Sequence, residues 1–448
     1  MSLTLRDLPA DARGVLPSQL LEEAIGLGYI DAGEYRVHED AVQPASLDLR
    51  LGDRAYRLRC SFLPDTEAVA TKMKPLVIDE LDLRGEGAVL EPNRPYLIPL
   101  REALALPPGV RARANPKSST GRLDVFTRVI TDRSYRFDEI RAGYNGPLYL
   151  EVVLLSFAVQ VREGLALNQL RLVVGRSVLT DEELQAEHDA KPLLYRRGTP
   201  VARDQFATAD GLFLSLDLRG DERRHVGYRA KQNTPRLAMD GIGTHPVAAY
   251  WESVTSEEGD RIVLDPERFY LLLSEESVCV PPHLAAEMTA FDPTSGELRT
   301  HYAGFFDPGF GYARSDDLLG SRAALEVRAH DVPFMIEHGQ RVCKLTFERM
   351  LAPPAKLYGE DVGSNYQGQV ETLSTLPASE GERAGRSPTG CRRQPAGSVR
   401  GDAPCVSVAR GDQRRSAKNA VSSAADSSAR TPGRTSTSWA SRGSAPRW

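Results

Sequence analysis

One stretch of eight residues, LEPNRPYL at positions 90–97, recurs as LDPERFYL at positions 264–271, and this repetition decides the fold. Three further matches follow in the same order. Pro107-Pro108 matches Pro281-Pro282, and Leu150-Glu151-Val152 matches Leu325-Glu326-Val327. Between them, the set Pro116, Ser118 and Arg122 matches the set Pro293, Ser295 and Arg299. The offsets stay between 174 and 177 residues, and a looser match links SLDLR at 46–50 with SLDLR at 215–219. Because ordered matches at a nearly constant spacing do not arise by chance, the chain is predicted to be a tandem duplication.

Each copy has the sequence pattern of β structure. Runs of strand-forming residues such as 149–155 and 269–273 are separated by Pro and Gly about every ten residues, which is typical of a β-sandwich or barrel. Few helices are expected. One is predicted at 19–27 with Ser18 as its N-cap, and a capping sequence at 180–184 predicts a second, short helix between the copies.

The length of 448 residues exceeds what a single core usually supports. We therefore predict a first barrel with an N-terminal helix at 1–175, a linker at 176–200 and a second barrel with a C-terminal lid at 201–370. Residues 371–448 are rich in Ser, Arg, Ala, Gly and Pro and nearly lack Leu, Ile and Phe, so a disordered tail is predicted there. A basic tail can also serve as a nucleic-acid arm, but an extension without a function is the interpretation we favour.

Composition limits the class of protein. The formal net charge of −5 argues against a nucleic-acid polymer as partner, although it leaves room for a small anion. The five cysteines are scattered and form no CxxC pair, which argues against a zinc or dithiol site and favours a reducing compartment. Residues 1–12 do not resemble a signal peptide, and no apolar run reaches the length of a membrane helix. A soluble, cytoplasmic protein without a membrane partner is expected.

Several motifs occur in a fixed order along residues 40–370. They are VQPASLDLRLG (42–52), KSSTGR (117–122), GYNGPLYLE (143–151), AGFFDPGFG (303–311), and Tyr358 followed by GSNYQGQ (363–369). In this order and spacing they resemble the motifs of bacterial dCTP deaminases, members of the dUTPase-like trimeric barrel superfamily, in the long, duplicated form of that family. The second copy lacks the doubled serine, and Asn365 stands where the family usually has a lysine.

The resemblance implies a mainly β fold, a tandem pair of dUTPase-like, jelly-roll-like barrels with a few short helices. It also implies deamination of dCTP to dUTP and ammonia by attack of water at cytosine C4 without a metal, a reaction that feeds dUMP and dTTP synthesis. Zinc deaminases carry His-x-Glu and Pro-Cys-x-x-Cys, and the sequence contains neither. Magnesium is expected only as the ion that accompanies the triphosphate.

Glu326 and Glu151 are the candidate catalytic residues. Each interrupts an apolar strand, and each occupies the same place in its copy. A carboxylate can take a proton from water and return it to the ring, and partial burial would raise its pKa toward a useful value. The alternative is that each is an ordinary strand residue facing solvent.

The other candidate residues would bind the nucleotide. Hydroxyls and a guanidinium suit phosphate oxygens, which favours Ser118, Ser119 and Arg122 and, in the weaker copy, Ser295 and Arg299. By resemblance, the hairpin contributes a backbone carbonyl, mapped to Ala303, and Asp307, with Phe305, Phe306 or Phe310 beside the sugar. By the same resemblance the lid contributes Tyr358, Tyr366 and Gln369. The alternatives are that the serine and arginine motif is only a polar turn, that the hairpin has no role in binding, and that the lid is only a terminal loop.

In this superfamily the phosphate motif and the nucleoside hairpin of one site come from different barrels. One chain could therefore combine Ser118, Ser119 and Arg122 of the first copy with Glu326 of the second. The same packing predicts a homo-oligomer with its barrels in threefold or pseudo-threefold arrangement.

Two other functions remain open at this stage. A dUTP diphosphatase, or a bifunctional enzyme that carries dCTP to dUMP, would share the phosphate motif and use an aspartate such as Asp307 to activate water. A nucleotide-binding protein that kept the fold without turnover is the third possibility.

Overall fold

The computed structural model describes most of the chain up to Leu373: residues 4–239, 245–289, 298–300, 304–312, 319–329, 331–359, 361–362, 366–367 and 372–373, with only the backbone at 298–300. Ser295, Ala303 and Gln369 lie outside these residues, as does nearly all of the predicted tail. The described part is mainly β, which confirms the fold class expected from the sequence.

The first half of the chain forms two large antiparallel sheets whose inner faces share one hydrophobic core. The first consists of β1 (Gly14–Val15), β3 (Leu47–Arg50), β8 (Val110–Pro116), β10 (Glu139–Ile140) and β13 (Ala166–Val174). The second consists of β2 (Ile30–Asp31), β4 (Arg54–Leu58), β5 (Val77–Asp82), β7 (Pro95–Ala105), β9 (Val125–Thr131) and β11 (Asn145–Leu154).

The second half repeats this plan around its own core. Its larger sheet holds β14 (Leu194–Arg196), β15 (Thr199–Pro200), β17 (His225–Ala230), β19 (Trp251–Thr255), β21 (Phe269–Val278), β23 (Leu298–Thr300) and β25 (Ser321–Ala329). The smaller sheet holds β16 (Leu212–Ser215), β22 (Leu284–Thr289), β24 (Phe305–Phe306) and β27 (Arg341–Arg349). A two-stranded ribbon joins β20 (Arg261–Leu264) to β26 (Phe334–Glu337).

The repeated sequences pair in the same register in both halves of the structure. Glu151 of β11 lies opposite Leu97 of β7, and Glu326 of β25 lies opposite Leu271 of β21. Leu97 and Leu271 close the two copies of the eight-residue stretch. The duplicated sequences therefore occupy equivalent positions in two similar sheets, and each places its glutamate at the same point of a strand pair.

The helices of the described chain are short. They are α1 (Ser18–Gly26), α2 (Val69–Lys72), α3 (Ser118–Gly121), α4 (Asp181–Ala190) and α5 (Val247–Tyr250), with 3-10 turns η1 (Glu39–Ala41) and η2 (Lys74–Leu76). The prediction of Ser18 as N-cap is wrong. Pro17 precedes the first helical turn, and Ser18 is already helical and buried. No helix in the described residues is long and apolar enough to cross a membrane.

The helix at the junction of the copies begins as predicted. Thr180 accepts a hydrogen bond from the Glu183 N–H, and the Glu183 side chain accepts one from the Thr180 N–H. This capping box fixes the first turn of α4.

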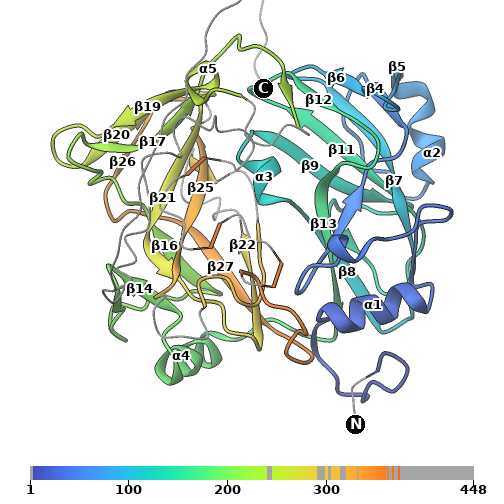
Figure 1. Ribbon diagram of the computed structural model, residues 1–448, viewed down its shortest axis with the longest axis horizontal. Coiled ribbons are helices and arrows are strands. Elements are labelled where there is room, and N and C mark those ends of the chain that lie inside the picture. The colour runs from blue at the N-terminus through green and yellow to red at the C-terminus, as the bar shows by residue number, and fades with distance from the viewer. Residues whose placement is uncertain are drawn as a thin grey trace, which may run out of the picture. The chain divides into compact units, whose positions relative to one another are not determined.

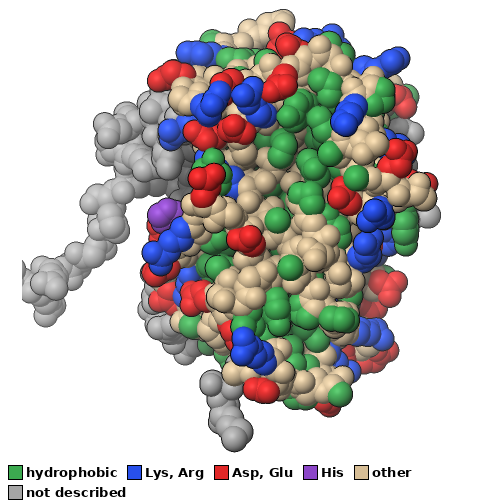
Figure 2. Space-filling view, turned by 90° about the vertical axis from the view of Figure 1, so that its right-hand side faces the viewer, with side chains coloured by type: hydrophobic (Ala, Val, Ile, Leu, Met, Phe, Trp, Pro, Cys, Tyr) green, Lys and Arg blue, Asp and Glu red, His purple; other side chains and the backbone are tan. Residues whose placement is uncertain are grey.

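The two halves meet along β8 and β13 on one side and β22 and β27 on the other (Figure 1). A parallel pair, β12 (Val159–Val161) with β18 (Leu237–Ala238), also joins them, and β12 pairs in turn with β6 (Ala88–Leu90). On the face shown in Figure 2, basic and acidic side chains are interspersed near the edge and hydrophobic side chains gather down the middle.

Charged groups are buried at the junction. The Arg171 guanidinium of β13 is fully buried and contacts the carboxylates of Asp307 at 3.0 Å and Glu348 at 3.4 Å, both from the second half. Arg113 of β8 pairs with Glu287 of β22 at 2.7 Å and also contacts Glu348. Ion pairs therefore hold the halves together where water is excluded.

Candidate active site

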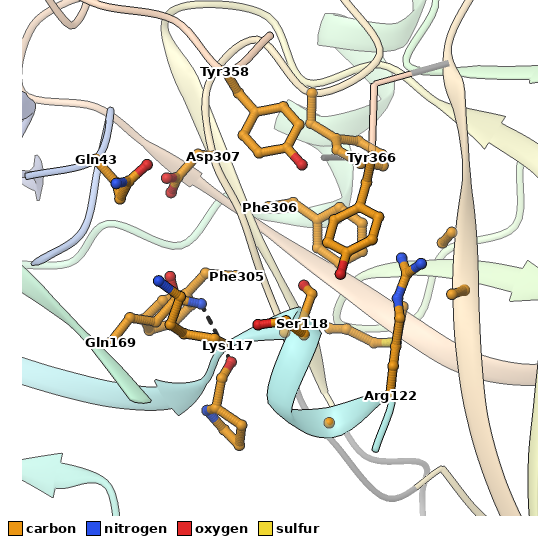
Figure 3. A pocket seen from close by; sticks show the side chains of 18 of the residues that line it. Gln43, Lys117, Ser118, Arg122, Gln169, Phe305, Phe306, Asp307, Tyr358 and Tyr366 are labelled. Atoms are coloured by element: carbon orange, nitrogen blue, oxygen red, sulfur yellow. Dashed lines mark hydrogen bonds between the residues drawn. The ribbon is translucent and has the colours of Figure 1, made fainter. Parts of the chain in front are cut away.

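A pocket of about 220 Å³ opens at this junction and receives residues from both halves (Figure 3). The first half contributes the segment from Lys117 to Arg122, together with Gln43, Asp48 and Gln169. The second half contributes the hairpin at 304–310, residues of β25, Tyr358, Val362 and Tyr366. The division of the site between the copies is the one expected from the sequence.

One wall of the pocket is the single helical turn α3. Because β8 ends at Pro116, the chain turns at Lys117 and presents Ser118 and Ser119 to the cavity before Arg122 closes the turn. The Lys117 ammonium is paired with the Asp48 carboxylate, whose pKa is raised by burial. These hydroxyl and cationic groups face one small volume, an arrangement that suits a polyphosphate.

The Arg122 side chain is buried and precisely held. Its guanidinium lies 3.8 Å from the centre of the Tyr366 ring and donates to the carbonyl oxygens of Thr372 and Leu373, each at 3.2 Å. Thr372 and Leu373, which stand at the start of the tail predicted at 371–448, therefore contact the arginine of the first half.

Glu326 faces α3 from the opposite wall. It lies on β25 between the fully buried Leu325 and Val327, and only 9% of its surface is exposed. Burial raises the pKa of Glu326 to about 8, with the Arg122 charge opposing the shift and the Asp124 charge adding to it. Burial therefore keeps a proton on this carboxyl group up to a higher pH than on an exposed glutamate.

Gly121 provides the space for this carboxylate. A methyl group at Gly121 would lie 2.7 Å from Oε2 and 2.8 Å from Oε1 of Glu326, closer than van der Waals contact allows. The glycine of the phosphate motif therefore sets the position of the candidate base, although the two residues belong to different copies.

On the activity that the sequence resemblance implies, Gly121→Ala is expected to lower kcat for dCTP by about 100-fold, because a displacement of about 1 Å at a reacting group can cost that much. The matched control is Gly109→Ala, since a methyl group at Gly109 meets no atom within 4 Å. Steady-state rates of ammonia release compare the two. A Gly121→Ala enzyme with the wild-type kcat would show that the carboxylate does not need this position.

The hairpin after β24 forms the remaining wall. Asp307 is buried, and its carboxylate accepts hydrogen bonds from Arg171 at 3.0 Å and from the Ser46 hydroxyl at 3.4 Å. Burial raises the pKa of Asp307 and the Arg171 charge opposes this. Phe306 packs edge-to-face on Phe310 with ring centres 4.9 Å apart, and the Tyr358 N–H donates to the Pro308 carbonyl at 2.9 Å.

Glu151 is not brought to this pocket. It is almost fully buried on β11 and pairs with Arg128, which lies opposite it on β9. The Arg128 guanidinium in turn stacks 3.7 Å from the centre of the Phe137 ring. The two glutamates occupy equivalent strand positions, but only Glu326 faces the cavity that contains the serines.

The remaining predicted residues divide in two groups. Tyr358 and Tyr366 line the pocket, as expected. The backbone of Arg299 lies on β23 opposite Arg328, and Ser295, Ala303 and Gln369 fall outside the described residues.

Some pocket residues were not predicted. Lys117 and Asp48 both lie inside motifs that the sequence reveals, so their place in those motifs was the available signal. Gln43 also lies inside one of these motifs, at 42–52, whereas Gln169 carries no such signal, because its approach to the pocket depends on how β3 and β13 pair.

The pocket does not offer an obvious protein cage for a metal. Within the described residues, no group of three or more His, Cys, Asp or Glu side chains lies close enough to hold a metal ion. Asp48, an acidic residue that lines the pocket, is already paired with Lys117.

Comparison with known proteins gives one consistent family. Models of the 2′-deoxycytidine 5′-triphosphate deaminase N-terminal and C-terminal domains match residues 12–176 and 180–376. A dUMP-forming dCTP deaminase of Methanobrevibacter smithii is 32% identical over 166 residues, 36% of this chain and 78% of that protein. A dUMP-forming dCTP deaminase of Corynebacterium glutamicum is 33% identical over 161 residues, 35% of this chain and 76% of that protein. A crystal structure of the dCTP deaminase of Agrobacterium tumefaciens shares 45% identity and a TM-score of 0.73, covering 79% of this chain and 100% of that one.

Proposed function

This chain belongs to the 2′-deoxycytidine 5′-triphosphate deaminase family, and we propose that it hydrolyses dCTP to dUTP and ammonia in the pocket between its halves, with Glu326 as the proton-transferring group. The observation that carries the proposal is the placement of the buried Glu326 carboxylate against the phosphate-motif turn of the other copy.

In this proposal α3 holds the triphosphate. The hydroxyls of Ser118 and Ser119 and the cationic groups of Lys117 and Arg122 face the cavity and would bind phosphate oxygens. The pyrimidine then points toward β25 and the hairpin, where Phe305 and Phe306 offer apolar surface beside it.

The chemistry needs one carboxylate that shuttles protons. Glu326 in its ionised form takes a proton from the water that attacks C4 and delivers it to ring N3. The C4 hydroxyl of the tetrahedral intermediate then gives up its proton, which Glu326 transfers to the amino group. The C4–N4 bond breaks, ammonia leaves and the C4 carbonyl of dUTP forms. Protons balance, and Glu326 returns to its ionised form.

Magnesium would arrive with the nucleotide in this proposal. The described residues do not gather a set of protein ligands for a fixed ion, and phosphate oxygens and water can supply most of the coordination of Mg²⁺. Its contribution would be to neutralise phosphate charge beside Lys117 and Arg122.

The pH dependence of kcat/KM should reveal the raised pKa of Glu326. Because the base must be ionised and burial raises its pKa to about 8, kcat/KM for dCTP is expected to fall about tenfold per pH unit below that value. The rate is expected to level off at higher pH. Initial rates between pH 5.5 and 9.5 test this. Rates that stay constant from pH 8 down to pH 5.5 would contradict the assignment, because a glutamate with its ordinary pKa is already ionised there.

The product of the reaction separates deamination from the alternative. Several relatives are dUMP-forming dCTP deaminases, so this chain could cleave the α–β phosphate bond as well. The carboxylate of Asp307, which such a reaction would require, is held by Arg171 and Ser46, and this favours deamination alone.

The deciding experiment is incubation of the purified chain with dCTP and magnesium, followed by measurement of ammonia, dUTP, dUMP and pyrophosphate. Equal amounts of ammonia and dUTP are the expected result. Ammonia with dUMP and pyrophosphate would establish the bifunctional reaction. Binding of dCTP without ammonia would refute the proposal and indicate a protein that only binds the nucleotide.

A further inference from the structure

The side-chain amide of Gln367 is fully engaged with the backbone of the nucleoside-facing hairpin. Its Nε2 donates to the carbonyl oxygens of Gly309 at 3.2 Å and Tyr312 at 3.1 Å, and its Oε1 accepts from the Gly311 N–H at 3.0 Å. One half-buried side chain therefore supplies three hydrogen bonds to three residues of one short turn.

The turn needs such support because its backbone is unusual. Gly309 has φ of +103° and Gly311 has φ of +64°, a region that only glycine enters at low cost. The Gly311 N–H donates to the side-chain oxygen of Gln367. The same turn carries Asp307 and Phe310, which line the pocket.

The residue before Gln367 contacts the opposite wall of the pocket. The Tyr366 ring covers the guanidinium of Arg122, which belongs to the first half and lies at the phosphate end of the site. Two consecutive residues thus bind the hairpin of one copy and the arginine of the other.

We propose that Gln367 is a positioning residue that holds the hairpin at 305–312 in its substrate-binding shape and, through Tyr366, links that shape to the phosphate-binding Arg122. The inference rests on the proposed function for its kinetic consequences. The contacts predict that the nucleoside wall and the phosphate wall become ordered together.

The role depends on a primary amide rather than on volume. A glutamate at this position has the same size, but its ionised carboxylate cannot donate and would face the carbonyl oxygens of Gly309 and Tyr312. Alanine removes all three bonds without introducing a charge. A residue that merely fills space would tolerate glutamate better than alanine, whereas a positioning amide predicts the reverse.

The test compares Gln367→Ala and Gln367→Glu with a matched control. Gln160→Ala serves as the control because the Gln160 amide also bonds a backbone carbonyl, that of Glu86 at 2.7 Å, on a strand that contributes no residue to the pocket. The measurements are kcat and KM for dCTP and the hydrogen exchange of the peptide containing Gly311.

Three lost hydrogen bonds predict a decrease of roughly tenfold to 100-fold in kcat/KM for Gln367→Ala, together with faster exchange of the Gly311 amide. Gln367→Glu should lose at least as much at pH 8. Its activity relative to the wild type should recover toward pH 5, where the protonated carboxyl can donate. Gln160→Ala should match the wild type in both measurements.

Wild-type kinetics and unchanged Gly311 exchange in Gln367→Ala would overturn the inference, and so would a Gln367→Glu enzyme more active than Gln367→Ala at pH 8. Failure of the proposed function gives a different result, since the wild type itself would then release no ammonia from dCTP. The exchange measurement would still test the contact between Gln367 and the hairpin.

Discussion

Replacing Glu326 with glutamine should lower kcat for dCTP by about 10³- to 10⁴-fold while leaving dCTP affinity nearly unchanged, because the amide keeps the shape of the side chain but cannot accept the proton of water. The phosphate-binding residues Ser118, Ser119 and Arg122 remain in place. Ammonia release measures the loss of turnover, and titration calorimetry with dCTP measures binding.

The matched control is Glu151→Gln, which makes the same change at the equivalent strand position of the other copy. Glu151 pairs with Arg128 and contributes nothing to the pocket, so this variant should keep most of the wild-type kcat. Equal losses in both variants would mean that each copy contains a working site and would refute the single site proposed at the junction.

Replacing Arg171 with methionine should destabilise the protein by about 3–5 kcal/mol, because it leaves the buried Asp307 carboxylate without its counter-charge and removes one of the two arginines that contact Glu348. Arg171 is fully buried and its guanidinium contacts both Asp307 and Glu348. Urea unfolding of the wild type and the variant gives the difference in the free energy of unfolding.

The pH dependence of this loss has a defined sign. Protonation removes the charge that Arg171 neutralises, and burial already raises the pKa of Asp307, so the destabilisation should shrink as the pH falls. Arg84→Met is the control, because the Arg84 and Asp82 pair is exposed and its removal should change stability little. An Arg171→Met protein as stable as the wild type at pH 8 would contradict the role of the buried ion pairs.

Much of the fold could be predicted because the duplication leaves local signals. The repeated stretch at 90–97 and 264–271 ends at leucines that face the two glutamates in equivalent registers. The capping box at Thr180 and the phosphate motif at 117–122 are likewise properties of neighbouring residues. Such patterns can be recognised in the sequence because they depend only on residues that are close together along the chain.

The combination of Glu326 with the phosphate motif of the other copy was expected from the sequence, but the contact partners of the two glutamates could not be predicted, because they belong to distant segments. Glu151 meets Arg128 through the pairing of β9 with β11, while Glu326 meets Gly121 across the junction of the halves. Arg171 shows the same limit, since nothing near it in sequence indicates Asp307 or Glu348 as its partners.

The pocket assembled from both copies also bears on how the two copies depend on each other. After the duplication, natural selection could favour anion binding in one copy and proton transfer in the other, so that each copy was free to lose the task that its twin retained. Glu151 pairs with Arg128 and does not line the pocket. Because both specialised copies are translated as one polypeptide, neither can be inherited, expressed or degraded without the other, and their division of labour is permanently fixed at one to one.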